Sequence, residues 1–227
     1  MSAFVVYSAL GSPFGRAVLA TLEEKGADYR LSPVAPGTFR EQAHLSRHPF
    51  GRVPVLDHAG FVLYETQAIL RYLDRVLPRP CLTPSDVRAA ARMDQVMNIA
   101  DWYFFQGVNK VIGFQRVIAP RLYGRAADEA AIAACLPNAH AVLSQLERLL
   151  SDQPYFAGVD ASLADIHMAA QMNLLAEAPE WSSLAAATPR IVDWLARMNA
   201  RPSFKATTWE RVEAMEKAHT RAYTGKA

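Results

Sequence analysis

A proline-rich segment divides the sequence into two parts with different patterns of apolar residues. Residues 77–85 read LPRPCLTPS, and three prolines in nine residues are typical of a linker, because proline fixes its own φ angle and lacks a backbone N–H. Before this segment, short apolar runs typical of strands alternate with helical periodicity, and after it only helical periodicity remains. We therefore expect an α/β domain over residues 1–78, a linker over 79–85 and an all-helical domain over 86–227.

The spacing of apolar residues also predicts the individual elements. Strands are expected at 4–7, 29–34, 55–56 and 61–63, and helices at 13–26 and 66–77. In the second part, helices are expected over 86–118, 130–150, 163–177, 189–200 and 203–218. Ser162, with Asp165 three residues later, and Thr188, followed by Pro189, are expected to cap two of these helices.

Composition and charge argue against several classes of protein. The net charge of +2 gives no indication of binding to nucleic acid or to an anionic membrane. The cysteines, Cys81 and Cys135, are far apart, which argues against a disulfide framework, a metal site and a dithiol redox centre. The first residues lack the features of a signal peptide, and there is no run of about 18 apolar residues that would span a membrane. A cytoplasmic, globular protein is expected.

The hairpin predicted at residues 54–63, PVLDHAGFVL, opens on a proline. Such a proline is either an ordinary trans residue at a strand start or a cis residue that has a purpose. A cis bond would turn the N–H and C=O of Val53 outward, where an extended peptide could pair with them as an added strand. The residues alone leave both alternatives open.

Ser12 and the pair Glu65-Thr66 stand where helices are expected to begin. Each of them could simply cap its helix. A helix start also binds anions through its free N–H groups and dipole, so Thr66 could hold a carboxylate while Glu65 holds the ammonium of an amino-acid head group. Ser12 could instead donate its hydroxyl to a ligand sulfur and favour the nucleophilic thiolate.

Taken together and in this order, four segments resemble the cytosolic glutathione transferases over nearly the whole chain. The segment 12–18, SPFGRAV, resembles the serine-type classes such as tau, phi and theta, and 46–74, SRHPFGRVPVLDHAGFVLYETQAILRYLD, is similar to the phi and theta-like pattern. The segments 155–169, YFAGVDASLADIHMA, and 188–204, TPRIVDWLARMNARPSF, are similar to the family's helical half. The resemblance implies a thioredoxin-like first domain with a cis-proline, followed by an all-α domain.

The resemblance also implies a function and a set of site residues. Glutathione would be the co-substrate, its thiol activated as thiolate by Ser12 for attack on an apolar electrophile, with peroxidase or isomerase chemistry as a possible side activity. The implied glutathione-binding residues are Phe14, Arg40, Arg52, Val53, Pro54, Glu65 and Thr66, and the implied electrophile pocket lies between the domains, with Phe14, Tyr103 and Phe104. A homodimer and a role in detoxification are further implications, while Tyr7 is an alternative thiol activator.

The sequence departs from the family pattern at three positions. Phe39 stands where phi-like members have a histidine, Arg52 replaces a glutamine or lysine, and His48 replaces an asparagine. An alternative function is therefore a non-catalytic protein that uses the same fold for binding or interaction. A cysteine-type thiol-disulfide reductase is disfavoured, because position 12 is serine and both cysteines lie outside the motif.

Overall fold

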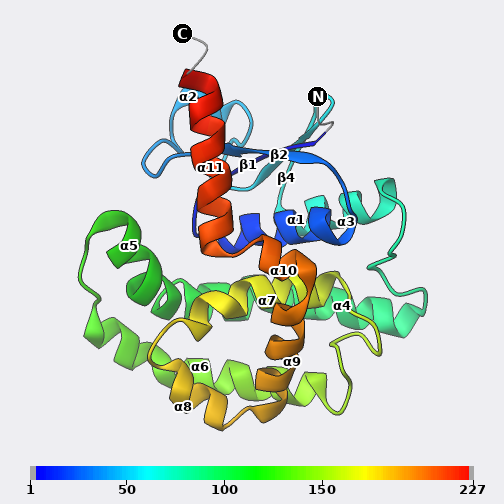
Figure 1. The fold of residues 1–227 in the computed structure, drawn as a ribbon. Coiled ribbons are helices and arrows are strands. Elements are labelled where there is room, and N and C mark those ends of the chain that lie inside the picture. Colours follow the sequence, from blue (N-terminus) through cyan, green and yellow to red (C-terminus); the bar gives the residue numbers. More distant parts are fainter. Residues whose placement is uncertain (1–3, 225–227) are drawn as a thin grey trace. The chain divides into compact units, whose positions relative to one another are not determined.

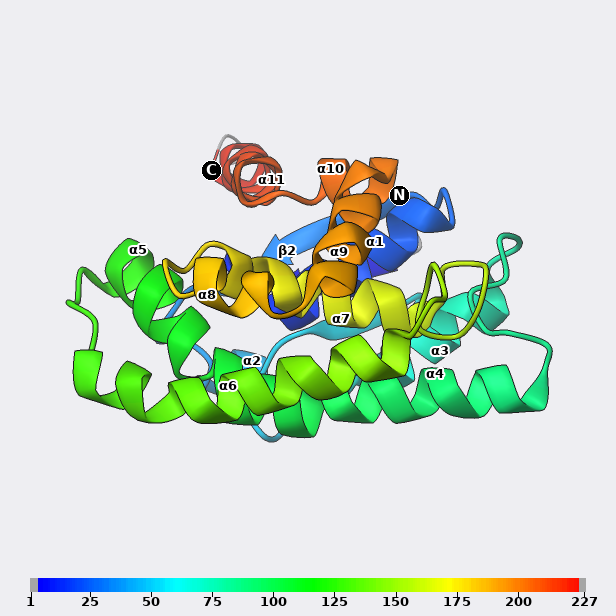
Figure 2. The same ribbon diagram turned by 90° about the horizontal axis from the view of Figure 1, so that it is seen from below.

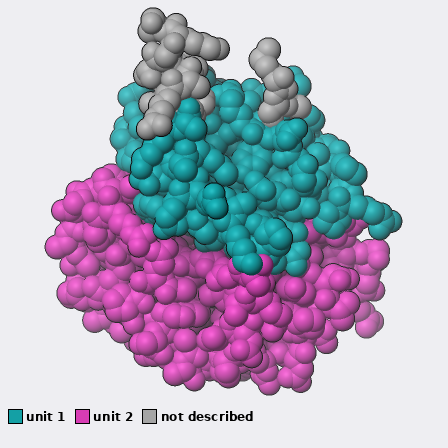
Figure 3. Space-filling view, viewed as in Figure 1, with its two compact units in different colours: residues 1–80, 201–227 teal, residues 81–200 magenta. Residues whose placement is uncertain are grey.

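The computed structural model describes residues 4–224, with side chains described up to residue 218. Its internal contacts define two compact units, which Figure 3 shows in different colours. Unit 1 comprises residues 1–80 together with the chain from Arg201 onward, and unit 2 comprises residues 81–200. The expected fold class is confirmed, because unit 1 contains a sheet flanked by helices and all regular elements of unit 2 are helical.

Unit 1 is built around a four-stranded mixed sheet. Its strands are β1 (Phe4–Ser8), β2 (Tyr29–Pro33), β3 (Val55–His58) and β4 (Phe61–Tyr64), in the order β2-β1-β3-β4 (Figure 1). β1 and β2 are parallel, as a crossover helix requires, and the other two pairs are antiparallel. The predicted hairpin is confirmed, with Ala59 and Gly60 in the positive-φ conformation that two-residue hairpin loops favour.

Helices α1 (Pro13–Glu24) and α3 (Thr66–Val76) pack against each other and form the core of unit 1 with the sheet. Their inward faces are apolar at helical spacing, and the core side chains Val6, Val18, Leu22, Leu56, Ile69 and Leu73 are all fully buried. A short helix that the sequence did not reveal, α2 (Gln42–Leu45), precedes the β3–β4 hairpin. Pro54 lies just before β3 and is buried.

The end of the chain belongs to unit 1, which differs from the predicted domain organisation. The helix expected over 203–218 is two helices, α10 (Pro202–Ala206) and α11 (Trp209–Thr224). α10 packs against α1, and α11 packs against β2. The physical reason is a set of polar contacts: the Glu24 carboxylate accepts hydrogen bonds from Arg201 and Ser203 at 2.5–2.8 Å. These partners are far apart in sequence, so local patterns could not predict them.

Unit 2 contains the remaining helices. They are α4 (Val87–Ile99), the π-helical segments η1 (Ala100–Asn109) and η2 (Phe114–Ile118), α5 (Ala119–Tyr123), α6 (Glu129–Leu150), α7 (Leu163–Ala176), α8 (Trp181–Ala186) and α9 (Pro189–Ala200). α7 is apolar on nearly every side and packs against α4, η1 and α9, so it forms the core of this unit (Figure 2). In the described part of the chain, every helix is too short or too polar to span a membrane.

Two predicted caps have different outcomes. The capping box at α7 is confirmed: Asp165 accepts the Ser162 N–H at 2.9 Å, and the same buried carboxylate accepts the Trp194 indole N–H at 2.9 Å. The Thr188 hydroxyl, however, donates to the carbonyl of Leu184 at 3.0 Å. The first N–H groups of α9 are instead bound by Glu147 of α6, which accepts from Arg190 and Ile191 at 3.1 and 2.9 Å.

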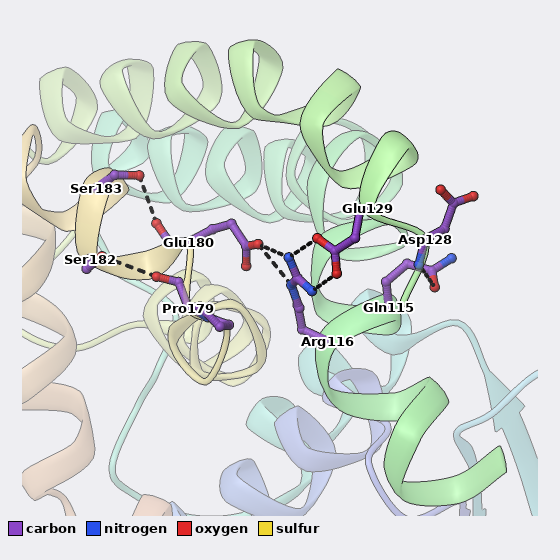
Figure 4. Close-up of polar contacts among 8 residues, drawn as sticks. All are labelled: Gln115, Arg116, Asp128, Glu129, Pro179, Glu180, Ser182 and Ser183. Carbon is purple, nitrogen blue, oxygen red and sulfur yellow. Dashed lines mark hydrogen bonds and ion pairs between the residues drawn. The ribbon is translucent and has the colours of Figure 1, made fainter. Parts of the chain in front are cut away.

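Arg116 of η2 bonds to the start of α6 and to the start of α8 (Figure 4). Its guanidinium donates to Glu129 at the start of α6 and to Glu180 next to α8. Its neighbour Gln115 accepts the N–H of Asp128 at 3.2 Å, and Asp128 in turn caps α6. The hydrogen bonds from Arg116 lower the pKa values of both Glu129 and Glu180. This network ties three helices of unit 2 together.

Candidate functional site

Ser12 caps α1 through its side-chain oxygen. Its Oγ accepts the N–H of Gly15 at 3.1 Å, and its backbone has the extended conformation of an N-cap residue. The structural reading of Ser12 is therefore correct. It does not exclude the functional reading, because a hydroxyl that accepts one bond can still donate its own proton.

Gly15 lets the start of α1 lie directly against β1. A Cβ built at Gly15 would stand 1.8 Å from the Oγ of Ser8 and 3.0 Å from its Cβ. Any other residue here would require the Ser8 side chain to move or the first turn of α1 to shift away from the strand. The position of Ser12 relative to the sheet therefore depends on this glycine.

Val53 and Pro54 are joined by a cis peptide bond, so Pro54 is the cis isomer and not an ordinary trans residue. A second cis bond joins Arg79 and Pro80, which the sequence did not predict. Pro54 is buried and Val53 is half-buried, while Arg52 is exposed. The chain therefore passes from the exposed surface at Arg52, through the half-buried Val53, into the buried core at Pro54.

Glu65 and Thr66 stand at the start of α3, as predicted. Thr66 is the first helical residue and is buried, whereas Glu65 is exposed, occupies the N-cap position and makes no side-chain cap bond. Glu65 has φ 71° and ψ 112°, a left-handed conformation that residues other than glycine seldom adopt. Strained residues of this kind cluster at functional sites.

Arg40 and Arg52 lie close to each other along the chain leading to Val53. A Cβ at Gly51 would approach the Cδ of Arg40 to 3.3 Å, so the stem of Arg40 packs directly on Gly51. Both arginines are exposed, so their guanidinium groups can pair with a carboxylate. Phe14, two residues after Ser12 on α1, is half-buried.

The ring of Tyr7 is in contact with the guanidinium group of Arg47, a residue that the sequence did not single out. The guanidinium carbon of Arg47 is 4.5 Å from the centre of the Tyr7 ring, a cation–π arrangement. Tyr7 is in β1, where it pairs with Ser32 and Val55. Its role as an alternative activator stays a prediction.

The two aromatics expected in the electrophile pocket have different surroundings. Both belong to η1 of unit 2. Phe104 has 0% of its surface exposed, so its ring packs in the core and presents no surface to a ligand. Tyr103 is 64% exposed, so its side chain is open to solvent.

Comparison with protein families matches both units. Residues 2–75 match the model of the glutathione S-transferase N-terminal domain, and residues 90–202 match that of the C-terminal domain. The chain therefore belongs to the glutathione S-transferase family, with its thioredoxin-like first domain and all-α second domain. It is an enzyme, a glutathione transferase, and glutathione is its co-substrate.

Relatives and solved structures agree with this assignment. A probable glutathione S-transferase of rice (Oryza sativa subsp. japonica) is 31% identical over 82% of this chain and 86% of its own. Glutathione transferase F7 of Populus trichocarpa has a TM-score of 0.80 at 27% identity, covering 90% of this chain and 97% of its own. A theta-class enzyme of Xanthomonas axonopodis pv. citri, solved with glutathione bound, has a TM-score of 0.80 at 27% identity, covering 91% and 97%.

Proposed function

We propose that this enzyme binds glutathione on unit 1 through the residues that the sequence singled out and conjugates it to apolar electrophiles. The observation that carries the proposal is the placement of Ser12. Its hydroxyl is fixed at the start of α1 by the N–H of Gly15 while its own proton remains available to a sulfur. The start of α1 adds the positive end of the helix dipole at the same point.

Thiolate formation is the step that these groups promote. A thiol with an ordinary pKa of about 8.5 is only about 3% ionised at pH 7, so lowering its pKa by about two units raises the thiolate fraction up to roughly thirtyfold. The lower basicity reduces this gain somewhat. The thiol proton leaves to solvent, and the sulfur forms a bond to the electrophilic carbon. Where the electrophile carries a leaving group, that group departs with the bonding electron pair.

The rest of the peptide would follow the exposed edge of unit 1. The N–H and C=O of Val53 would pair with the cysteinyl residue, as in strand addition. Thr66 and the first N–H groups of α3 would hold the γ-glutamyl carboxylate, and Glu65 would hold the adjacent ammonium. Arg40 and Arg52 would hold the glycine carboxylate. We retain Phe14 and Tyr103 as proposed contacts of the electrophile.

We also propose that the enzyme is a homodimer. Unit 1 exposes large apolar side chains: Phe50 is 62% exposed and Phe61 is 52% exposed, and Phe61 lies on the edge strand β4. Exposed apolar groups of this size favour an interface with another chain. Sedimentation velocity of the wild type and of Phe50→Ala tests this proposal, since loss of the apolar contact should shift the protein toward monomer.

A cytoplasmic location and a role in detoxification complete the proposal. Both cysteines, Cys81 and Cys135, are free, as is usual in a reducing compartment. A panel of glutathione with a nitroaryl halide, an isothiocyanate and a hydroperoxide would identify the favoured chemistry. Fractionation of cells that express the tagged protein would test the location.

Three variants at position 12 test the role of the hydroxyl. Ser12→Ala should lower conjugation tenfold or more, because the thiolate loses the hydroxyl that donates a hydrogen bond to it. Glutathione should still bind, because the other proposed contacts of the peptide remain. Ser12→Thr should retain much of the activity. Ser12→Asp is the matched control, because aspartate caps a helix well but cannot donate a proton when ionised. Activity in Ser12→Asp equal to the wild type would show that capping alone is needed, and the assignment of Ser12 would be wrong.

A further inference from the structure

A buried histidine on α2 binds the backbone directly ahead of the cis-proline. His44 is almost fully buried, and its Nε2 lies 2.8 Å from the carbonyl oxygen of Arg52. A carbonyl only accepts hydrogen bonds, so Nε2 of His44 carries the proton and donates it. The Arg52 carbonyl and the Val53 N–H belong to one peptide group, so this contact fixes the peptide group that carries the N–H of the proposed cysteinyl clamp.

A second buried histidine, one helical turn later, packs on the residue that precedes Glu65. The ring of His48 is stacked on Tyr64 with 4.7 Å between ring centres and 30° between planes. Phe50 packs edge-on against both rings, at 6.2 Å from His48 and 6.1 Å from Tyr64. This stacking fixes the end of β4, where the chain turns into the strained conformation of Glu65.

The two histidines form one rigid support. The N–H of His48 donates to the carbonyl of His44 at 2.9 Å, and the two ring centres are 6.3 Å apart. Among the described residues, neither Nδ1 atom has a hydrogen-bond partner, and both are buried. Burial, followed by the nearby His44 and Arg52, lowers the pKa of His48. Buried rings with fixed contacts of this kind hold the neighbouring groups in place.

We infer that His44 and His48 are positioning residues for glutathione: one turn of chain carries both, and they fix the spacing between Val53 and Glu65. The inference rests on the proposed function, since it takes the roles of Val53 and Glu65 from it. The peptide held by Val53 and the head group held by Glu65 belong to one ligand. Displacing either segment relative to the other therefore weakens binding of that ligand.

A matched pair of amides tests His44. In His44→Gln, the amide nitrogen takes the place of Nε2 and can still donate to the Arg52 carbonyl. In His44→Asn, the shorter side chain cannot reach it. We expect the dissociation constant of glutathione, measured by isothermal titration calorimetry, to rise about fivefold in His44→Asn and to stay within about twofold of the wild type in His44→Gln. The KM of the electrophile should not change in either variant.

The stacking of His48 is tested in the same way. His48→Phe keeps a flat ring against Tyr64, whereas His48→Leu removes it. Binding of glutathione should weaken severalfold in His48→Leu and remain near the wild type in His48→Phe.

His58→Leu is the control for a general loss of stability. His58 is in the same sheet, its Nδ1 lies 2.7 Å from the hydroxyl of Tyr72, and its ring is stacked on Phe4. None of these groups belongs to the proposed clamp. We expect this variant to lower the midpoint of thermal unfolding about as much as His44→Asn does, with glutathione binding unchanged.

Three results would overturn the inference. They are wild-type affinity in His44→Asn, equal weakening in His44→Gln and His44→Asn, and an equal loss of affinity in His58→Leu. The proposed function is measured separately by the wild type and Glu65→Ala. If the wild type binds glutathione and Glu65→Ala weakens binding, an unaffected His44→Asn refutes the positioning role alone. If the wild type does not bind glutathione, the proposed function itself is wrong.

Discussion

Glu24 at the end of α1 and Arg201 at the start of the C-terminal segment form a two-pronged ion pair. The Nε and Nη2 atoms of Arg201 donate to the two carboxylate oxygens at 2.6 and 2.8 Å, although the residues are 177 positions apart. Ser203 donates to the same carboxylate. This contact joins the last helices of the chain to the unit that carries the proposed glutathione site.

Replacing Glu24 with glutamine should loosen the C-terminal segment. Arg201 would lose its charged partner, and we expect a loss of about 2 kcal/mol in the free energy of unfolding, less than for a fully buried pair. Burial raises the pKa of Glu24, but hydrogen bonds from Arg201 and Ser203 outweigh it, and the pKa lies below its usual value. The ionised Glu24 therefore stabilises the folded protein fully at pH values above its ordinary pKa near 4.5. This stabilisation is lost as the pH falls through the lowered pKa of Glu24 in the folded state.

Urea denaturation of Glu24→Gln at pH 7 measures this loss. Glu177→Gln is a suitable control, because its ion pair with Arg121 is largely exposed and should contribute less than about 0.5 kcal/mol. An equal effect of both substitutions would contradict the importance of the Glu24 contact.

Glu216 of α11 should give the same segment the opposite pH dependence. Burial, and then the neighbouring Glu213 carboxylate, raise the pKa of Glu216 to about 7, although a hydrogen bond from the backbone of Leu10 lowers it. A carboxyl group with a raised pKa stabilises the fold fully below the ordinary value of 4.5, and this stabilisation is lost as the pH rises through 7. Glu216→Gln should therefore raise the thermal midpoint at pH 8 more than at pH 5.

Scanning calorimetry at these two pH values checks the sign. Glu213→Gln should move the transition in the wild-type pH profile to lower pH, because it removes one cause of the raised pKa. A Glu216→Gln variant that stabilises the protein equally at both pH values would show that this carboxyl does not titrate in the range.

Lys25 should be essential for the junction after α3. Its ammonium is completely buried, lies 2.6 Å from the Asp74 carboxylate and donates to the carbonyl oxygens of Asp74, Pro78 and Pro80. Lys25→Met should cost about 3–5 kcal/mol, because Asp74 would then lose its buried cation. The double variant Lys25→Met, Asp74→Asn should recover part of that loss, and denaturant unfolding of the three proteins measures the coupling.

Gly15→Ala should displace the start of α1 and reduce activity. The added methyl group would overlap the Ser8 hydroxyl, so we expect a loss of about 1–3 kcal/mol and a fall in conjugation. Ser8→Ala in the same chain should relieve the overlap in part. If Gly15→Ala alone keeps full activity, the spacing between β1 and Ser12 is not important for the reaction.

Features set by neighbouring residues were predicted well from the sequence. Ser12 and Pro13 start α1 where expected, Gly26 follows its end with a positive φ, and the Ser162–Asp165 capping box is formed. These signals act within one turn of helix, so a single sequence contains all the information they need. The start of α3 at Thr66 was predicted for the same reason. The fold class was predicted from the periodicity of the whole chain and from the family resemblance.

Features set by distant contacts were not predicted. Thr188 looks like a helix cap in the sequence, but Glu147 supplies the carboxylate that binds the first N–H groups of α9. The four aromatics at 102–105 gave no sign that Phe104 alone would be fully buried. His44 had no signal at all, because its partner is a backbone carbonyl, which any residue at position 52 would present.

The arrangement of unit 1 has a consequence for biosynthesis. A ribosome releases the chain from its N-terminus, so β2 emerges long before α11, whose Met215 and Glu216 contact Tyr29 and Leu10. Until translation has passed the whole of unit 2, the nascent chain therefore lacks the helix α11 that packs against β2. A premature stop codon directly after residue 200 would leave residues 81–200 of unit 2 in place and remove α10 and α11 from unit 1.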